Sequence, residues 1–326
     1  MSEIKFGLTL PQGWRHDLAD KPPIQQFEYS KNMALAADKL RFDSVYAYDH
    51  FIPHYNYEKH KTFFECFTLI SAIASITKNV KIGQIVTCNS YRNPGLLAKM
   101  VATLDAITNG RAELGIGAGW YEEEYLAYGY DFPANKIRIE QLDESISIIK
   151  QMWKRKYATC LGKHYSVRKA VCNPKPIQKP HPVIMVGGSG EKYLLKVVAK
   201  HADRYNLYFG TPEEMTRKIN IIKQYCTAVG RKSSQIEYSV VLPCLIREDQ
   251  KTVQKELQKR KKKGQTTEQF RQALAGGYAI GTPDEIVAGI RKYIETDVTH
   301  FVLHFMGLDE SILKLFRSKV AKNLQA

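Results

Sequence analysis

The dipeptide Asp49-His50 is the part of the sequence best suited to acid–base chemistry. Histidine titrates near neutral pH, so His50 can donate or accept a proton during a reaction. Both residues directly follow a strand-like run over residues 43–48. A metal site that joins His50, His54 and Asp49 is disfavoured, because Pro53 breaks any helix that would present both imidazoles on one face and no other ligand cluster is apparent. We therefore expect a catalytic role for His50 and no metal; the alternative is a histidine that only orders its loop.

The segment Gly187-Gly188-Ser189-Gly190 has the composition of an anion-binding turn between a strand and a helix. Glycines let backbone amides approach an anion, the following helix N-terminus adds partial positive charge, and Lys192 is nearby. Four small residues in a row exceed the needs of an ordinary turn, so we predict a phosphate site here. A second glycine-rich segment, residues 115–119, lacks the final spaced glycine of a dinucleotide fingerprint. We interpret it as leaving room for a flat ligand.

Two further features favour structural interpretations. Cys88 follows a strand, but the sequence identifies no partner base that would make it a nucleophile, so we interpret it as packing. The basic run over residues 259–263 is most simply a solvated helix face or a lid. A nucleic-acid contact is the alternative for this run, although it lacks interleaved aromatic residues and belongs to no recognisable DNA or RNA module.

An alternation of short β-rich runs with helical stretches positions these segments along the chain. Eight parallel strands with helical crossovers predict an α/β fold, a (β/α)8 TIM barrel with insertions at 157–176 and 249–276. No Pro/Gly/Ser linker divides the chain, so we expect one domain over 1–326 rather than two doubly wound domains. In a barrel, the active site lies at the carboxyl ends of the strands. The expected strands are residues 4–10, 43–48, 80–87, 111–116, 182–186, 204–209, 236–246 and 300–305.

The composition is that of a globular protein, with 44% hydrophobic and 25% charged residues among 326. Six cysteines without a CxxC pair fit a reducing compartment. No apolar run is long enough to span a bilayer, and the first residues lack the basic region of a signal peptide. These features predict a cytoplasmic protein without a membrane partner. The net charge of +15 attracts polyanions, either nucleic acid or a phosphorylated small molecule, or it is only a solvated basic surface.

Longer motifs carry a family resemblance. They are Asp49-His50-Phe51, Tyr91-Arg92-Asn93-Pro94-Gly95 with Ala102-Thr103-Leu104-Asp105, Gly115-Ile116-Gly117-Ala118-Gly119-Trp120-Tyr121-Glu122, Asn173-Pro174-Lys175-Pro176, and Val186-Gly187-Gly188-Ser189-Gly190 with Ala202-Asp203-Arg204-Tyr205-Asn206. In these motifs the chain resembles the bacterial-luciferase-like superfamily, specifically its deazaflavin (coenzyme F420)-dependent oxidoreductases. The resemblance covers nearly the whole chain, and it separates deazaflavin users from FMN users much less well.

The resemblance implies a barrel that holds a flavin-like ring at its carboxyl-terminal face. It also implies a cis non-prolyl peptide bond on the third strand, which counting back from Pro94 puts at Gln84-Ile85. His50 matches the proposed proton donor of the family. The residues that match the cofactor site, with the phosphate on the turn and the helix start after it, are Asp49, Gln84, Ile85, Thr87, Ala118, Gly119, Gly187, Gly188, Ser189, Gly190, Glu191 and Lys192.

One position departs from the resemblance. Trp120 occupies the place where sugar-phosphate dehydrogenases of the family carry a glutamate, so the expected substrate is a small organic molecule other than a sugar phosphate. The expected reaction is hydride transfer to or from F420, whose phosphate and oligoglutamate tail suit a basic protein. An FMN-dependent monooxygenase is the alternative within the superfamily, and a basic nucleic-acid-binding barrel is the alternative outside it. A homodimer is compatible with the sequence.

Overall fold

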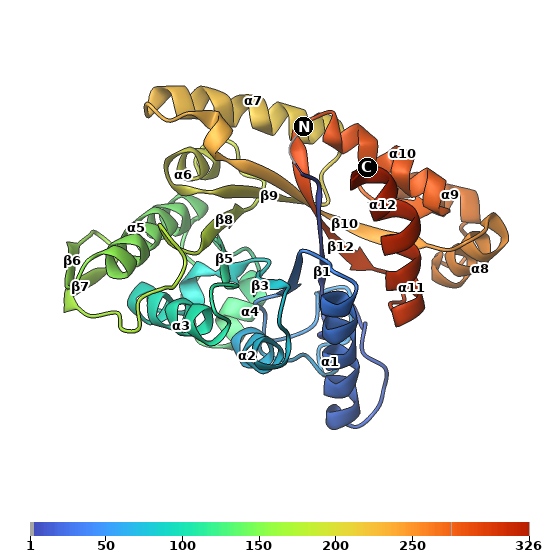
Figure 1. The fold of residues 1–326 in the computed structure, drawn as a ribbon, viewed down its shortest axis with the longest axis horizontal. Helices are drawn as coiled ribbons and strands as arrows, with labels where there is room; N and C mark the ends of the chain where they lie inside the picture. The colour runs from blue at the N-terminus through green and yellow to red at the C-terminus, as the bar shows by residue number, and fades with distance from the viewer. Residues whose placement is uncertain (1–2, 275, 326) are drawn as a thin grey trace.

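A single parallel sheet closes on itself at the centre of the computed structural model, which describes residues 3–274 and 276–325 (Figure 1). The order of neighbouring strands is β3-β2-β1-β12-β10-β9-β8-β5-β4, and an isolated parallel bridge between Ile82 and Ala112 joins β3 to the start of the β5 strand. The barrel predicted from the sequence is therefore confirmed. Its strands are β1 (Lys5–Thr9), β2 (Ser44–Ala47), β3 (Lys81–Gln84), β4 (Thr87–Cys88), β5 (Glu113–Gly117), β8 (Val183–Gly187), β9 (Arg204–Tyr208), β10 (Glu237–Ile246) and β12 (Val298–Phe305).

The third barrel strand is interrupted, which is why it appears as the two short strands β3 and β4. The peptide bond Ile85-Val86 between them is cis. Our prediction of a cis bond at Gln84-Ile85 is wrong by one residue. Gln84 still pairs in register with Ala47 of β2, whereas pairing resumes only at Thr87, opposite Ile116. The position of the cis bond follows from where the strand pairing stops and resumes. A count of residues along the sequence does not give it.

Helices surround the barrel and bury their apolar faces against it (Figure 1). In the helix over residues 135–154, Leu142, Ile146, Ile149 and Trp153 form a buried stripe. The helices between strands are α1 (Pro23–Lys39), α2 (Cys66–Ile76), α3 (Pro94–Ile107), α4 (Glu122–Ala127), α5 (Asn135–Lys154), α6 (Leu194–His201), α7 (Pro212–Ala228) and α10 (Pro283–Ile294), with 3-10 turns η1 (Asn89–Tyr91) and η2 (Ser233–Gln235). The chain closes with α11 (Glu310–Leu315), a π-helical turn at Phe316–Ala321 and α12 (Lys322–Gln325).

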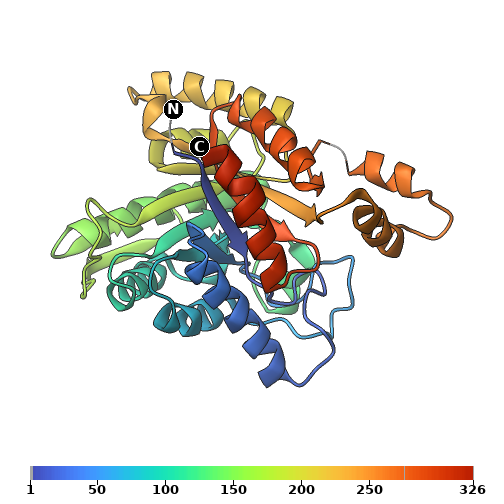
Figure 2. The same ribbon diagram turned by 45° about the vertical axis from the view of Figure 1, so that its right-hand side comes forward.

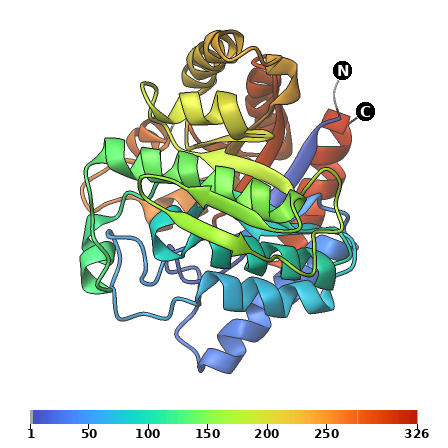
Figure 3. The same ribbon diagram turned by 90° about the vertical axis from the view of Figure 1, so that its left-hand side faces the viewer.

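Both expected insertions lie outside the barrel. The first is an antiparallel hairpin of β6 (Ala158–Leu161) and β7 (Ser166–Ala170), beside α5 (Figure 3). The second contains α8 (Gln250–Arg260) and α9 (Thr267–Ala273), which project from the side of the barrel (Figure 2). A short strand that we did not predict, β11 (Ala279–Gly281), pairs with the end of β10. The basic run extends beyond the end of α8 rather than covering one helix face.

A layer of charged side chains fills the barrel at the amino ends of the strands. Arg204 donates to Glu113 at 2.8 Å and to Glu237 at 2.5 Å, and Tyr46 donates to Glu113 at 2.5 Å. All four groups begin their strands or lie within two residues of the start. This layer closes one end of the barrel, so a ligand can enter the barrel axis only from the opposite, carboxyl end. Among the described residues, no helix is both long enough and apolar enough to cross a membrane.

Candidate active site

A cavity of about 560 Å³ opens at the carboxyl ends of the barrel strands. It is the end at which (β/α)8 barrels place their active sites. Ten of the residues expected in the site line the cavity, whereas Gln84, Glu191 and Lys192 do not. The ten are Asp49, His50, Ile85, Thr87, Ala118, Gly119, Gly187, Gly188, Ser189 and Gly190.

His50 lies in this wall with one ring nitrogen already engaged. Its Nδ1 lies 2.8 Å from Oε2 of Glu124, a residue of α4 that has no exposed surface. The ring stacks on the indole of Trp14, with centroids 3.9 Å apart and planes 11° apart. The imidazole is therefore fixed in plane and in rotation, as an acid–base catalyst requires. The sequence prediction missed Glu124 and Trp14, which lie 74 and 36 residues from His50 along the chain.

Aromatic rings form the rim of the cavity near His50. Trp120 and Tyr121 stack with centroids 5.1 Å apart, and Trp120 is 51% exposed. The ring centroid of Trp120 lies 5.8 Å from that of His50, and the ring centroid of Tyr55 lies 6.1 Å from that of Trp120. The nearby His54 also packs against Trp14, with ring centroids 5.1 Å apart. Burial lowers the pKa of His54 to about 4, so this imidazole is neutral at pH 7.

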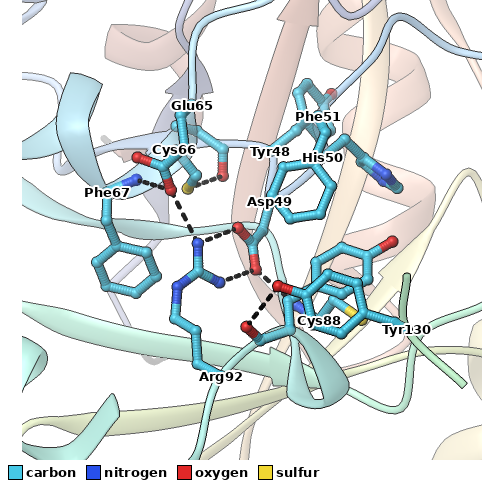
Figure 4. Close-up of polar contacts among 12 residues, drawn as sticks. Tyr48, Asp49, His50, Phe51, Glu65, Cys66, Phe67, Cys88, Arg92 and Tyr130 are labelled. Carbon is cyan, nitrogen blue, oxygen red and sulfur yellow. Dashed lines mark hydrogen bonds and ion pairs between the residues drawn. The ribbon is translucent and has the colours of Figure 1, made fainter. Parts of the chain in front are cut away.

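Asp49 faces into a cluster behind the cavity wall (Figure 4). The guanidinium of Arg92 donates to both of its carboxylate oxygens, at 2.7 and 2.9 Å, and also to Glu65 at 2.8 Å. The backbone N–H of Cys88 donates to Asp49 at 2.9 Å. The family resemblance gives Asp49 a cofactor contact, but its oxygens already have partners in this structure. These contacts tie Asp49 to Arg92 and to the last residue of β4.

The glycine-rich turn lines the end of the cavity that lies toward α6. Gly188 has a φ of +137°, a conformation that residues with a side chain rarely adopt. The ammonium of Lys218 donates to the carbonyl of Ser189 at 2.7 Å and to Glu191 at 3.2 Å, which holds the turn against α7. The family resemblance also assigns a phosphate contact to the helix start at Glu191-Lys192.

Residues 191–193 form a turn, and α6 begins only at Leu194. Glu191 pairs with Arg217 at 2.9 Å and with Lys218, so it faces away from the cavity. The Lys192 ammonium lies over the ring of Tyr193. Neither residue lines the cavity, whereas residues 187–190 of the turn do.

Buried polar atoms without a partner mark where a polar ligand fits this cavity. Among the described residues, the hydroxyl of Thr87 and the Nε1 of Trp14 are buried in its wall and form no hydrogen bond. The Nε of Arg138, a residue of α5 that also lines the cavity, is in the same state. Such groups are costly unless a ligand or water satisfies them. Their presence, with the glycine turn, fits a ligand that has a polar ring system and an anionic end.

Gln84 also has a buried amide without a partner, but it lies inside the barrel rather than in the cavity wall. The neighbouring Gly115 brings strands together: a Cβ there would lie 1.9 Å from the carbonyl oxygen of Gln84. Gly115 therefore serves close strand packing, whereas Gly117, Ala118 and Gly119 of the same segment line the cavity. The interpretation of Cys88 as packing is consistent with its position, because burial raises the pKa of its thiol to about 12. Across the part of the chain that the structure describes, no three His, Cys, Asp or Glu side chains are grouped as metal ligands.

Comparisons with known proteins agree with this geometry. The family model of luciferase-like monooxygenases matches residues 4–300. An F420-dependent glucose-6-phosphate dehydrogenase of Amycolatopsis mediterranei is 27% identical, over 97% of this chain and 99% of its own length. An FMNH2-dependent dimethylsulfone monooxygenase of Pseudomonas putida is also 27% identical, over 70% of this chain and 62% of its own. The solved structure of an F420-dependent secondary alcohol dehydrogenase with an F420–acetone adduct has a TM-score of 0.80 at 21% identity and covers 98% of each chain.

Proposed function

The chain belongs to the luciferase-like monooxygenase family, and from this premise we propose that it is an oxidoreductase that transfers a hydride between coenzyme F420 and a small organic substrate. The observation that carries the proposal is one cavity lined by two different features. A clamped imidazole, His50, lies among aromatic rings in its wall, and a glycine-rich turn lines the same cavity. This pair of features suits a cofactor that has a ring and a phosphate and that lies beside a substrate exchanging a proton.

The residues present fit such a cofactor. The backbone of residues 187–190 would bind its phosphate, and Arg138, whose Nε has no partner, lines the same cavity. The unpartnered hydroxyl of Thr87, with Ala118 and Gly119, would line the ring. When bound, a deazaflavin supplies a carbon centre that accepts or gives a hydride. The protein's own contribution is then to orient the substrate, exclude water and move one proton.

His50 would move that proton. It would protonate the substrate oxygen during reduction or accept the proton during oxidation, at the point where charge develops. The rim of Trp120, Tyr121 and Tyr55 would shield the reacting atoms from water and hold an apolar substrate body. Among the residues lining the cavity, the only carboxylate is that of Asp49, which is tied to Arg92. An alcohol or ketone with an apolar body suits this wall better than a polyhydroxylated sugar.

F420 is preferred over FMN for two reasons. The F420-dependent relative matches over 99% of its own length, whereas the FMNH2-dependent monooxygenase matches over 62%. The net charge of +15 also suits a cofactor with an anionic tail. An FMN-dependent monooxygenase remains the second candidate, because relatives of that kind share the fold and more than two thirds of this chain.

A spectral titration of the purified protein with each cofactor separates these candidates. We expect F420 to bind with a Kd at least tenfold below that of FMN, a difference of about 1.4 kcal/mol. Preferential FMN binding would move the assignment to the monooxygenases. Salt-sensitive binding to DNA or RNA without affinity for either cofactor would contradict both and favour the nucleic-acid alternative.

A further inference from the structure

The carboxylate of Glu124 is completely buried and has four hydrogen-bond partners. Its Oε1 accepts from the backbone N–H groups of Phe51 at 2.7 Å and Ile52 at 3.2 Å. Its Oε2 accepts from the hydroxyl of Tyr91 at 2.5 Å and lies 2.8 Å from Nδ1 of His50. Backbone N–H groups can only donate, so Oε1 carries no proton. Glu124 thus has a defined hydrogen-bond role on each of its two oxygens.

The proton in the contact between His50 and Glu124 belongs to the histidine. Burial alone would raise the pKa of Glu124, but the hydrogen bond from His50, its charge and the other donors lower the pKa below its usual value. An ionised carboxylate is an acceptor only, so Nδ1 of His50 must be the donor. This holds whether the ring is neutral or protonated. Free histidine prefers the other neutral tautomer, with its proton on Nε2, and Glu124 reverses that preference.

We propose that Glu124 is a positioning residue that keeps a proton on Nδ1 of His50 and thereby makes Nε2 the atom that exchanges a proton with the substrate. Nε2 forms no hydrogen bond within the described part of the chain, and His50 lines the cavity. Stacking on Trp14 prevents the ring from turning to exchange its two nitrogens. The chemical meaning of this arrangement rests on the proposed function, whereas the tautomer itself is a property of the chain alone.

The proton balance follows directly for a ketone and its alcohol. In reduction, a hydride forms the new C–H bond, the carbonyl π pair moves to oxygen, and the Nε2 proton of cationic His50 forms the O–H bond. His50 is left neutral with its Nδ1 proton still donated to Glu124. In oxidation, the Nε2 lone pair accepts the hydroxyl proton as the hydride leaves. Glu124 stabilises the cationic ring in both directions, because it stays ionised.

The titratable and charged groups around His50 come from several elements. They are Asp49 with Arg92, His54, Tyr121, Tyr91 and Glu124. The charge of Asp49 is paired with Arg92, and His54 is neutral at pH 7. Burial raises the pKa values of Tyr91 and Tyr121 above 10. Glu124 is therefore the unpaired anion in contact with the ring.

The test compares the native chain with Glu124→Gln by 15N NMR of the histidine rings in the cofactor-free protein. The His50→Asn variant assigns the signal. Glutamine offers one oxygen, which the backbone N–H groups of Phe51 and Ile52 will take, so its NH2 group faces Nδ1. We expect Nδ1–H in the native neutral ring and Nε2–H in Glu124→Gln. Tyr91→Phe, which removes another donor from the same oxygen, should keep the native tautomer.

Kinetics supply an independent readout. Glu124→Gln should lower kcat at least tenfold and leave the Kd of the cofactor within about twofold, because the cationic ring loses its anion. A native ring with Nε2–H, or one tautomer in both proteins, would overturn the inference. If Glu124→Gln does not fold, the native spectrum and Tyr91→Phe still decide the tautomer. If the tautomers are as expected but F420 is not turned over, the proposed function fails and the tautomer assignment remains.

Discussion

At the scale of single residues, the site depends on how completely each catalytic group is constrained. Trp14 fixes the plane of His50, and the ring is only 13% exposed. Asp49 has both oxygens in contact with Arg92, so its own contribution is structural support rather than free charge. The adjacent residues His50 and Asp49 thus have different roles. His50 has a ring nitrogen free toward the cavity, whereas the carboxylate of Asp49 is paired with Arg92.

Replacement of His50 by asparagine removes the titrating group and keeps a polar side chain. We expect near-native cofactor binding and a turnover about 10²-fold lower, the usual size of general acid–base catalysis. Steady-state rates from pH 6 to 8 check this, together with a cofactor titration. Native turnover across that range would mean that His50 only orders its loop.

Replacement of Asp49 by alanine leaves Arg92 half-buried without its main partner and removes the acceptor for the N–H of Cys88. Breaking such a pair destabilises a protein by about 3–5 kcal/mol. We expect a lower urea midpoint together with weaker cofactor binding. Arg92→Ala should produce the same two losses through the same cluster. Weaker cofactor binding at unchanged stability would instead indicate a direct contact by Asp49.

At the scale of elements, the connection from β8 to α6 determines where an anion can bind. Gly188 is conformationally constrained, and a Cβ there would lie 2.6 Å from Leu194. Gly190 is exposed, and a Cβ on it would meet only ordinary contact, 3.7 Å from Leu194. A substitution at Gly190 therefore tests charge rather than backbone strain.

Gly190→Asp should weaken F420 binding at least tenfold, because it places a carboxylate beside the expected phosphate. The uncharged and equally large Gly190→Asn should remain within about threefold of the native affinity. Both affinities come from the same spectral titration, with circular dichroism to check the fold. Equal affinities for the two variants would remove the phosphate assignment.

Much of the barrel could be predicted because each strand and each helix has its own local pattern. The strand ends located His50, Thr87 and the glycine turn without any contact information. What could not be predicted depends on contacts between distant segments. Glu124 belongs to a helix of six residues, too short for a clear periodic pattern, and its partner His50 is 74 residues away. The break between β3 and β4 likewise follows from pairing with neighbouring strands.

At the scale of the whole molecule, the two ends of the barrel have separate tasks. The carboxyl ends of the strands bear the cavity, and the amino ends bear the buried charges that close the barrel. His300 and His304 are buried on β12, and burial lowers the pKa of each to about 3. Burial alone would raise the pKa of Glu237, but the charges of Arg204, His300 and Lys5, with the hydrogen bond from Lys5, together lower it to about 2. Because these groups have shifted pKa values in the folded chain, the stability of the barrel depends on pH.

We expect stability to fall as the pH drops from 6.5 toward 3. In that range the unfolded chain binds protons on these histidines and the folded chain does not, so acid favours unfolding. Glu237 causes a further loss of stability between about pH 4.5 and 2. In that range its carboxylate stays ionised in the folded chain and is protonated in the unfolded chain. Each histidine contributes on the order of 4 kcal/mol over the full range. Urea midpoints at pH 7, 6, 5 and 4 measure the effect.

His300→Gln should make the dependence of the urea midpoint on pH shallower. The same change at His60, whose side chain is 78% exposed, should leave that dependence unchanged. Identical slopes for the native chain and His300→Gln would show that the buried histidine does not control acid unfolding.

The central claim, hydride transfer between F420 and a small organic substrate, is tested most directly by anaerobic turnover. Oxidised F420 is mixed with the protein and a panel of secondary alcohols with apolar bodies, and the visible absorbance of the cofactor is followed. The account predicts loss of that absorbance with at least one alcohol, a matching yield of ketone, and a rate about 10²-fold lower for His50→Asn. No absorbance loss with any alcohol, together with FMNH2-dependent oxygen uptake by the same protein, would contradict it.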